Sequence, residues 1–391
     1  MRPPSFLRPL RALVATLFCA VAATLPSTAA RAEMRAAWVA SVHNLNFPSS
    51  AGLSAEAQQA EIRRIVSTAA ASGLNTLMVQ VRPEGDALYR SRIEPWSRFV
   101  SGTQGVDPGY DPLATFIAEG RAQGIAIHAW INPYRAATSS KVARARNHVT
   151  NTMPGAVRRV GSMLWMDPGD PAVRQHVVRV VQDIVSRYDV AGVVIDDYFY
   201  PYPGSGIPRG TFPDDATFAK YGKGQSRGDW RRNNVHSLVR DLSGVVSGGG
   251  RRFGVSPFGI WRPNVPPGVE AQLDQVMEIY SDPLVWMREG WIDYLSPQLY
   301  WADAGPQSYS ALLQWWRSPQ ANPRGVPIIP SIAADRVGGS HKWPASEIAR
   351  QLELEKKIGP RRGNTAGFIL WSMGPVMRDL KGVREVIRSS R

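Results

Sequence analysis

The sequence predicts an α/β fold of the (β/α)₈ type, a TIM barrel, and three observations support this prediction. From Arg35 onward, short apolar runs alternate with longer segments whose apolar residues recur at helical spacing. Eight such runs follow one another over about 350 residues, the size of one barrel with insertions. No change of composition and no Pro- and Gly-rich linker interrupts them. We therefore expect residues 33–391 to form a single domain.

The eight apolar runs are the predicted strands. Each is too short for a helix of usual length. In chain order they span residues 36–40, 76–81, 125–131, 192–196, 253–256, 292–296, 327–331 and 367–372.

The segments between the strands carry the signals of helices. Ser54, Asp111 and Asp170 can each accept a hydrogen bond from the first backbone N–H groups of a helix, and proline follows both aspartates. The predicted helices span 55–72, 112–123, a segment that begins at 171, 230–246, 269–286, 308–316 and 346–358.

An open, doubly wound sheet is the alternative α/β architecture. Such a sheet places a glycine-rich phosphate loop after its first strand. The segment 42–49 follows the first predicted strand and contains no glycine. The sequence therefore favours the closed barrel.

Polar and aromatic residues gather at the carboxyl ends of the predicted strands, where a parallel barrel places its reactive groups. These residues are Trp38 and Asn44; Gln80, Arg82 and Glu84; Trp130, Asn132, Tyr134 and Arg135; Asp196, Asp197, Tyr198 and Tyr200; Ser256, Trp261 and Arg262; Gln298, Tyr300, Trp301 and Asp303; Asp335 and Arg336; and Trp371. The longest connections, 132–168 and 198–228, follow the third and fourth strands. We expect them to cover the cleft.

The fourth predicted strand ends in two adjacent acids, Asp196 and Asp197. A carboxylate next to a hydrophobic core is costly unless it is paired or opens into a cleft. Either acid taken alone has a structural explanation, such as an ion pair with Arg82 or Arg135. The pair together points to a reactive site.

Cleavage of a glycosidic bond needs one carboxyl as general acid and a second as nucleophile or base. Adjacent residues of a strand point to opposite faces, so Asp196 and Asp197 are a poor couple by themselves. Glu84 and Asp303 are the other acids close to strand ends, and the seventh strand ends without a glutamate. We expect one strand-four aspartate to react and the other to orient it, with Glu84 as the alternative second carboxyl.

Aromatic and amide side chains at the strand ends suggest a carbohydrate ligand. Sugar rings stack on aromatic side chains through their C–H faces, and their hydroxyl groups need polar partners at fixed positions. The candidate substrate-binding residues are Trp38, Arg82, Trp130, Asn132, Tyr134, Tyr198, Tyr200, Trp261, Gln298, Tyr300, Trp301, Asp303 and Trp371. For any single ring, the alternative is a structural role in capping the barrel core.

Other chemistries lack their motifs. The chain has six histidines and no H-x-H or H-E-x-x-H spacing, which argues against a zinc hydrolase. It also has no G-x-S-x-G elbow and no Walker loop. We predict no metal and no cofactor.

Residues 1–32 are predicted to be a signal peptide. Three arginines precede an apolar run that is too short to span a bilayer, and Ala30-Arg31-Ala32 forms a cleavage site. Loss of this segment removes four arginines and no acid, so the formal net charge falls from +14 to +10. The remaining charges are scattered, which is typical of a solvated surface. We expect a periplasmic or secreted protein that has no transmembrane segment and does not bind nucleic acid.

Six motifs in matching order resemble the glycosyl-hydrolase-like 10 family, from about Arg35 to the end of the chain. They are MRAAWVA at 34–40, NTLMVQVRPEGD at 75–86, HAWINPY at 128–134, IDDYFYP at 195–201, SPQLYW at 296–301 and GFILWS at 367–372. The resemblance implies a glycosidase-type barrel of the bacterial envelope and, for some members, cleavage of peptidoglycan glycan strands that lack stem peptides.

Carried over by motif, the resemblance makes Asp196 or Asp197 the acidic signature and makes Arg82, Glu84, Asn132 and Gln298 polar site residues. Lactyl carboxylates exposed on stripped strands suit arginines such as Arg82, Arg135 and Arg262. The expected function is therefore an exported glycoside hydrolase of a cell-envelope polysaccharide. A non-catalytic glycan-binding barrel, a lytic enzyme and a hydrolase of an exopolysaccharide remain alternatives.

Overall fold

A computed structural model of the protein describes residues 1, 33–338, 341–360 and 367–390. The predicted signal peptide therefore lies, except for Met1, outside the described residues.

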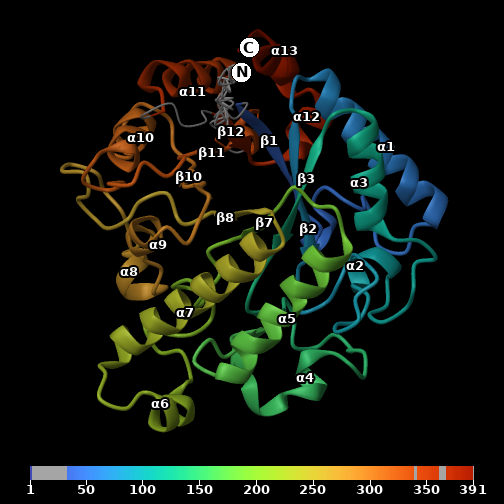
Figure 1. The fold of residues 1–391 in the computed structure, drawn as a ribbon, viewed down its shortest axis with the longest axis vertical. Coiled ribbons are helices and arrows are strands. Elements are labelled where there is room, and N and C mark those ends of the chain that lie inside the picture. The colour runs from blue at the N-terminus through green and yellow to red at the C-terminus, as the bar shows by residue number, and fades with distance from the viewer. Residues whose placement is uncertain (2–32, 339–340, 361–366, 391) are drawn as a thin grey trace.

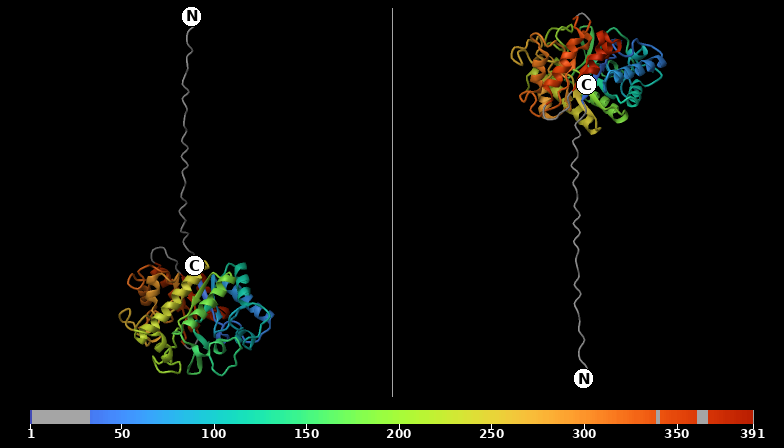
Figure 2. Two further views of the ribbon diagram at one scale, coloured as in Figure 1. Left: turned by 60° about the horizontal axis from the view of Figure 1, so that its bottom comes forward. Right: turned by 90° about the horizontal axis from the view of Figure 1, so that it is seen from above.

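In the described part of the chain, nine parallel strands form one sheet with helices around it (Figures 1 and 2). The strands are β1 (Met34–Val39), β2 (Thr76–Arg82), β3 (Ala126–Ile131), β7 (Gly192–Ile195), β8 (Arg252–Val255), β9 (Tyr294–Leu295), β10 (Gln298–Leu299), β11 (Ser331–Ile332) and β12 (Gly367–Leu370). Their order in the sheet is β10-β11-β12-β1-β2-β3-β7-β8-β9.

The two ends of this order are consecutive in the chain, and this closes the barrel. Only Ser296 and Pro297 separate β9 from β10. Leu295 also forms a parallel bridge with Ile328, which precedes β11. Pro297 has no backbone N–H to donate to a neighbouring strand, so the sixth barrel strand is interrupted and consists of the two short strands β9 and β10. The predicted (β/α)₈ fold class is confirmed.

The principal helices lie close to the predicted ranges, and three of them begin at the predicted capping residues. These helices are α1 (Ala55–Ala71), α3 (Pro112–Ala122), α5 (Pro171–Arg187), α7 (Arg227–Gly248), α10 (Tyr309–Arg317) and α11 (Ala345–Ile358), followed by α12 (Met373–Arg378) and α13 (Val383–Ser389). The side chains of Ser54, Asp111 and Asp170 accept hydrogen bonds from backbone N–H groups at the starts of α1, α3 and α5.

The single helix predicted over 269–286 is wrong. The segment instead contains α8 (Gln275–Glu278) and α9 (Pro283–Glu289). Asp274 caps α8, and Tyr280 has a positive φ of 57°, which a continuous helix does not allow. Pro283 then starts α9 at a position where its missing N–H costs nothing.

The connection after β3 contains a small antiparallel sheet that the periodicity did not reveal. It consists of β4 (Arg135–Ala137), β5 (Val157–Val160) and β6 (Met163–Met166), in the order β4-β6-β5. The remaining short helices are α2 (Arg98–Ser101), α4 (Val149–Thr152) and α6 (Asp215–Tyr221). The Trp165 indole in β6 donates a hydrogen bond of 3.1 Å to the Phe199 carbonyl, which ties this sheet to the connection after β7.

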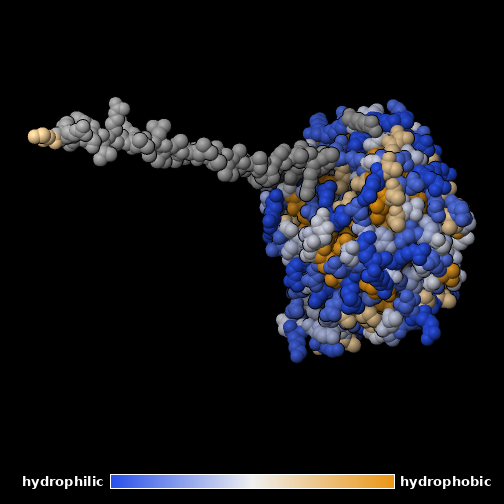
Figure 3. Space-filling view, turned by 45° about the vertical axis from the view of Figure 1, so that its right-hand side comes forward, coloured by the Kyte–Doolittle hydropathy of each residue, from blue (hydrophilic) through white to orange (hydrophobic). Residues whose placement is uncertain are grey.

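The strands have apolar side chains on both faces, so the molecule has two cores. Ala37 and Val39 belong to the large core between barrel and helices, whereas Ala36 and Trp38 point into the barrel. On the outer face shown in Figure 3, hydrophobic residues lie in small groups among hydrophilic ones. Among the described residues, no helix has the length and apolar composition that a membrane crossing requires.

Candidate active site

Three tryptophans from three strand ends form the floor of a cavity at the mouth of the barrel. The rings of Trp38 and Trp130 are 4.9 Å apart, and those of Trp130 and Trp371 are 5.9 Å apart. This first cavity has a volume of about 250 Å³. Its lining residues are Trp38, Trp130, Asp196, Tyr198, Ser256, Gln298, Tyr300 and Trp371.

Asp196 follows β7 directly and is held from below by two donors. The Trp130 indole donates to one carboxylate oxygen at 2.9 Å, and the Asn132 amide lies 3.1 and 3.2 Å from the two oxygens. Burial raises the pKa of Asp196 to about 6, although the Arg135 charge and these hydrogen bonds act in the opposite direction. The result is a carboxyl that changes charge near neutral pH.

Asp197 lies in a second cavity of about 760 Å³ next to the first. The Tyr202 hydroxyl donates a hydrogen bond to it. Burial raises the pKa of Asp197 to about 7; the Tyr202 hydrogen bond lowers it, and the charge of Asp196 raises it further. At neutral pH this carboxyl can hold a proton.

The two cavities form one groove, which we call the catalytic groove, because Tyr198 and Gln298 line both. The small sheet after β3 contributes Arg135 and Met163 to the second cavity, and Thr138 directly follows β4. The connection after β7 contributes Tyr202 and residues 204–206. Adjacent in the chain, Asp196 and Asp197 thus face two neighbouring parts of one groove. Among the described residues, no other acidic side chain lines either cavity.

Arg135 provides positive charge in the wall of the catalytic groove. Its Nε donates to the Pro83 carbonyl at 3.0 Å, and its guanidinium lies 5.2 Å from the Tyr198 ring centroid. Among the described residues it has no carboxylate within salt-bridge distance, unlike Arg82, which pairs with Glu94, and Arg262, which pairs with Asp274. Arg135 is therefore placed to meet an anionic group in the groove.

Most of the sequence-predicted residues line or support this groove. Trp38, Trp130, Asp196, Asp197, Tyr198, Gln298, Tyr300 and Trp371 line it, and Asn132 holds Asp196. Trp301 lines a neighbouring cavity.

Glu84 lies behind the groove wall. Its carboxylate pairs with Arg98 at 3.1 Å and accepts from the Thr138 N–H at 2.5 Å. Burial raises the pKa of Glu84, but the contacts with Thr138 and Arg98 outweigh it and the net shift is downward. Because Thr138 lines the second cavity, this geometry suits the support of the wall more than proton transfer.

The other predicted residues lie outside the groove lining. Arg82 is fully buried in its ion pair with Glu94, and the Tyr134 and Tyr200 rings are buried in the outer core. Trp261 stacks against Trp315 at 5.8 Å and donates to Asp282 at 3.0 Å.

The Asp303 carboxylate accepts hydrogen bonds from residues at the start of α10. It accepts from the Ser308 hydroxyl and the Ser310 N–H and pairs with Arg350 at 2.7 Å. Although burial acts in the opposite direction, these donors lower its pKa to about 2. A carboxylate held in this way is not suited to donate a proton near neutral pH.

Several residues of the second cavity were not predicted, and Tyr202 and Phe258 are the aromatic ones among them. Tyr202 lies five residues after Asp197 in the run DYFYPY, and Phe258 lies two residues after the end of the fifth predicted strand. The density of rings after the fourth strand was a usable signal for Tyr202. Nothing local distinguishes Phe258 from a core residue.

Metal binding can also be judged from the geometry. Across the described ranges, no group of three or more histidine, cysteine or acidic side chains is close enough to hold a metal ion.

Comparisons with known proteins agree with this architecture. The family model of glycosyl hydrolase-like 10 matches residues 33–346. Glycosyl hydrolase YngK of Bacillus subtilis is 36% identical over 346 residues, which cover 85% of this chain and 67% of that protein. Glycosyl hydrolase DigH of Escherichia coli is 34% identical over 358 residues, covering 83% and 80%.

Solved structures with low sequence identity share the fold. The glycoside hydrolase domain of PgaB (BpsB) from Bordetella bronchiseptica aligns with a TM-score of 0.54 at 14% identity, covering 91% of this chain and 99% of that one. The C-terminal domain of a chitinase from Desulfitobacterium hafniense aligns with a TM-score of 0.53 at 12% identity, covering 92% and 99%. From the family match and the identity to its relatives, the chain belongs to the glycosyl hydrolase-like 10 family.

Proposed function

We propose that this glycosidase is exported and cleaves a cell-envelope polysaccharide, namely peptidoglycan glycan strands that lack stem peptides. The observation that carries the proposal is the position of Asp196 and Asp197, two buried carboxyls with raised pKa values at the centre of a groove lined by aromatic rings. Paired carboxyls in a cleft are the reactive groups of most glycosidases.

Asp197 is the proposed general acid. Burial and the charge of Asp196 raise its pKa to about 7, so this carboxyl can carry a proton at neutral pH. Protonation of the glycosidic oxygen by Asp197 lets the leaving sugar depart from the second cavity as an alcohol. The Tyr202 hydroxyl positions this carboxyl.

Asp196 is the proposed charged partner. The Trp130 and Asn132 donors orient it under the first cavity, where positive charge develops on the sugar ring during bond cleavage. Since no carboxyl from another strand lines the groove within the described residues, the attacking group is Asp196 itself, a water held by it, or an acetamido oxygen of the substrate.

The proposed substrate follows from the lining of the groove. Trp38, Trp130 and Trp371 offer apolar surface for the C–H face of a sugar. Arg135 offers a guanidinium for a carboxylate, such as the lactyl group of a stripped strand. The names of the relatives YngK and DigH, both glycosyl hydrolases, support the reaction class.

The decisive experiment incubates the purified protein with intact and with peptide-free glycan strands and analyses the products by mass. New reducing ends on peptide-free strands are the expected result. Anhydro-sugar ends would show that the enzyme cleaves the strands by a lytic reaction and not by hydrolysis. Retained binding without any product would overturn the proposal in favour of a glycan-binding barrel, and cleavage of an exopolysaccharide alone would overturn the substrate.

A further inference from the structure

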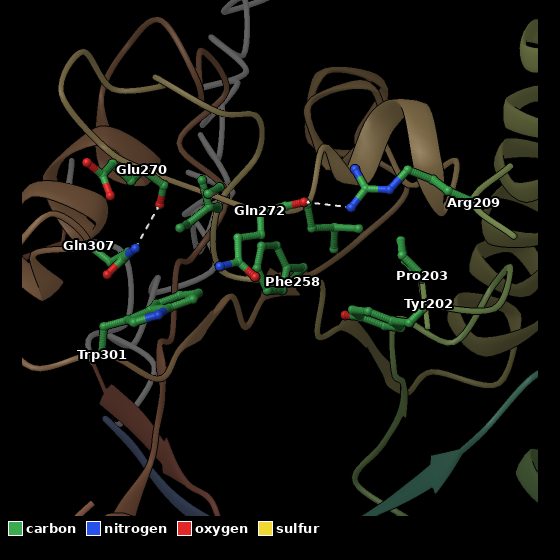
Figure 4. Close-up of a pocket in the computed structure, with 11 residues that line it drawn as sticks. Tyr202, Pro203, Arg209, Phe258, Glu270, Gln272, Trp301 and Gln307 are labelled. Carbon is green, nitrogen blue, oxygen red and sulfur yellow. Dashed lines mark hydrogen bonds between the residues drawn. The ribbon is translucent and has the colours of Figure 1, made fainter. Parts of the chain in front are cut away.

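A third cavity, of about 460 Å³, lies beside the catalytic groove. It is bounded by residues of three loops that follow barrel strands: Tyr202 and Arg209 after β7, Phe258 and residues 270–273 after β8, and Trp301 and Gln307 after β10. Figure 4 shows Trp301 on one side, Tyr202 on the other and Phe258 between them. Its volume is that of a small-ligand site, for which about 300–1,000 Å³ is usual.

The third cavity continues the catalytic groove. Tyr202 and Phe258 line both this cavity and the second one, which contains Asp197. The ring centroids of Tyr202 and Phe258 are 6.4 Å apart, and those of Phe258 and Trp301 are 5.6 Å apart at 90°. A row of rings therefore leads from the proposed general acid to Trp301.

We propose that the third cavity is a distal subsite that binds a further sugar of the leaving-group side of the glycan, with Trp301 as its main contact. The proposal rests on the proposed function, because it assumes that Asp197 protonates the glycosidic oxygen. The leaving part of the glycan then extends from Asp197 toward Trp301. The proposal assigns one sugar to each cavity, so the enzyme acts best on chains that reach from the first cavity to the third.

The chemistry of the lining suits an uncharged sugar ring. Trp301, Phe258 and Leu273 provide apolar surface, while Gln272 and Gln307 provide amides for hydroxyl groups. The charge of Arg209 is neutralised by its ion pair with Glu278. The other charged residue of the lining is the acid Glu270, which would repel an anionic sugar and can accept hydrogen bonds from the hydroxyl groups of a neutral one. This distinguishes the third cavity from the second, where Arg135 has no carboxylate within salt-bridge distance in the described chain.

The subsite is fixed by hydrogen bonds between its loops. The Gln307 amide donates to the Glu270 carbonyl at 3.1 Å, and Arg209 donates to the Gln272 carbonyl at 3.3 Å (Figure 4). The same residues that line the cavity therefore hold the loops from β7, β8 and β10 together. A ligand enters a cavity that is already formed, which lowers the entropic cost of binding.

The test compares peptide-free glycan strands of two to eight sugars as substrates. In the wild type, kcat/KM is expected to rise with length until the third cavity is filled. Trp301→Ala is expected to reduce this gain about 2- to 12-fold, as loss of one stacking contact implies. Gln307→Ala, a milder change, is expected to reduce it in the same direction.

Trp291→Ala is the matched control. Trp291 is also half-buried but precedes β9, at the opposite end of the barrel, so its loss should leave the gain with length intact. Thermal unfolding of each variant shows whether the fold is retained.

Binding of the same strands to Asp196→Asn and to Asp196→Asn combined with Trp301→Ala gives a readout that does not need cleavage. Tighter binding of long strands that is lost with Trp301 supports the subsite. The subsite is refuted if Asp196→Asn, with and without Trp301→Ala, binds long and short strands equally well. It is also refuted if Trp301→Ala and Gln307→Ala keep the full gain in kcat/KM with length. In either case the proposed function stands. Failure of the wild type to cleave any strand refutes the proposed function alone, because binding still tests the subsite.

Discussion

Asp196 and Asp197 are neighbours in the chain, yet their surroundings give them different chemistry. Asp196 accepts three contacts from Trp130 and Asn132, whereas Asp197 accepts from Tyr202 and is close to the charge of Asp196. Like charges at this proximity do not ionise together easily, so the pair loses its protons in two steps. Because the two deprotonation steps are separated, one carboxyl can be protonated and the other charged at the same pH.

Replacement of either aspartate should abolish most activity. We expect Asp197→Asn and Asp196→Asn each to lower kcat by about 10²–10⁴, the usual contribution of a general acid or its charged partner. Release of reducing ends from peptide-free strands measures this. Asp107→Asn, at an exposed ion pair with Arg90, is the control and should be as active as the wild type. Full activity of both groove variants would exclude the carboxylate mechanism.

The activity should have a bell-shaped pH dependence. As pH falls through about 6, Asp196 gains a proton and loses the charge that stabilises the transition state. As pH rises through about 7, Asp197 loses the proton that it donates. We therefore expect kcat/KM to be greatest between these values, measured at constant ionic strength. A plateau that extends to pH 9 would contradict Asp197 as the acid.

Arg135 should determine the preference for acidic strands. Arg135→Gln removes the guanidinium and is expected to lower kcat/KM about 10- to 100-fold on strands with lactyl carboxylates, the loss of one charge-assisted hydrogen bond. Oligomers of N-acetylglucosamine, which lack the carboxylate, should be less affected. The informative quantity is the ratio of kcat/KM for the two substrates. An unchanged ratio in Arg135→Gln would show that Arg135 does not bind the lactyl carboxylate.

At the scale of elements, the groove walls come from the connections between strands. The small sheet β4-β6-β5 places Arg135 and Met163 in the second cavity, and Glu84 holds the adjoining Thr138 through its carboxylate. A segment whose backbone is held at several points presents its side chains at fixed positions. Glu84, although predicted as a catalytic candidate, has the contacts of a positioning residue.

Glu84→Gln separates these two roles. Loss of the charge leaves Arg98 without its partner, so we expect the free energy of unfolding to fall by about 1–3 kcal/mol and KM to rise. The pH profile should keep its shape, since Asp196 and Asp197 are intact. A drop of kcat as large as that of Asp197→Asn would instead make Glu84 the second catalytic carboxyl. Urea unfolding and steady-state kinetics decide between them.

At the scale of the whole molecule, the buried acids of the groove reduce stability in return for reactivity. Asp197 has a raised pKa in the folded state, so between pH 4 and 7 this carboxyl is protonated more often in the folded protein than in the unfolded chain. The contribution of Asp197 to the free energy of unfolding therefore decreases as pH rises through this range. Glu94 has the opposite effect: the Arg82 ion pair overcomes burial and lowers its pKa to about 2, so its stabilisation is present at neutral pH.

Neutral replacement of Asp197 should therefore stabilise the fold above pH 7. We expect Asp197→Asn to unfold with a free energy about 2–4 kcal/mol greater than the wild type at pH 8, and with little difference at pH 4, where the wild-type carboxyl is already protonated. Urea titrations at the two pH values measure this. A difference that is the same at both pH values would mean that the effect is not due to the charge.

Local signals in the sequence were sufficient for the fold. Apolar runs of strand length, caps at Ser54, Asp111 and Asp170, and uninterrupted repetition predicted the barrel, because each depends on residues near one another in the chain. The same signals failed over 269–286, where a helical pattern hid two short helices on either side of Tyr280. The parallel barrel rule also predicted that Asp196, Asp197 and the surrounding rings lie at one end of the barrel, where they line cavities.

What only the tertiary structure decided is which strand-end side chains face the groove. Trp38 lies near the end of β1 and Trp261 follows β8, but Trp38 lines the first cavity whereas Trp261 stacks on Trp315. The sequence by itself determined the barrel, the position of Asp196 and Asp197 at its mouth and the richness in rings. The pairing of Tyr202 with Asp197 and of Arg98 with Glu84 depended on how the connections fold back over the strand ends, which the residue types alone do not determine.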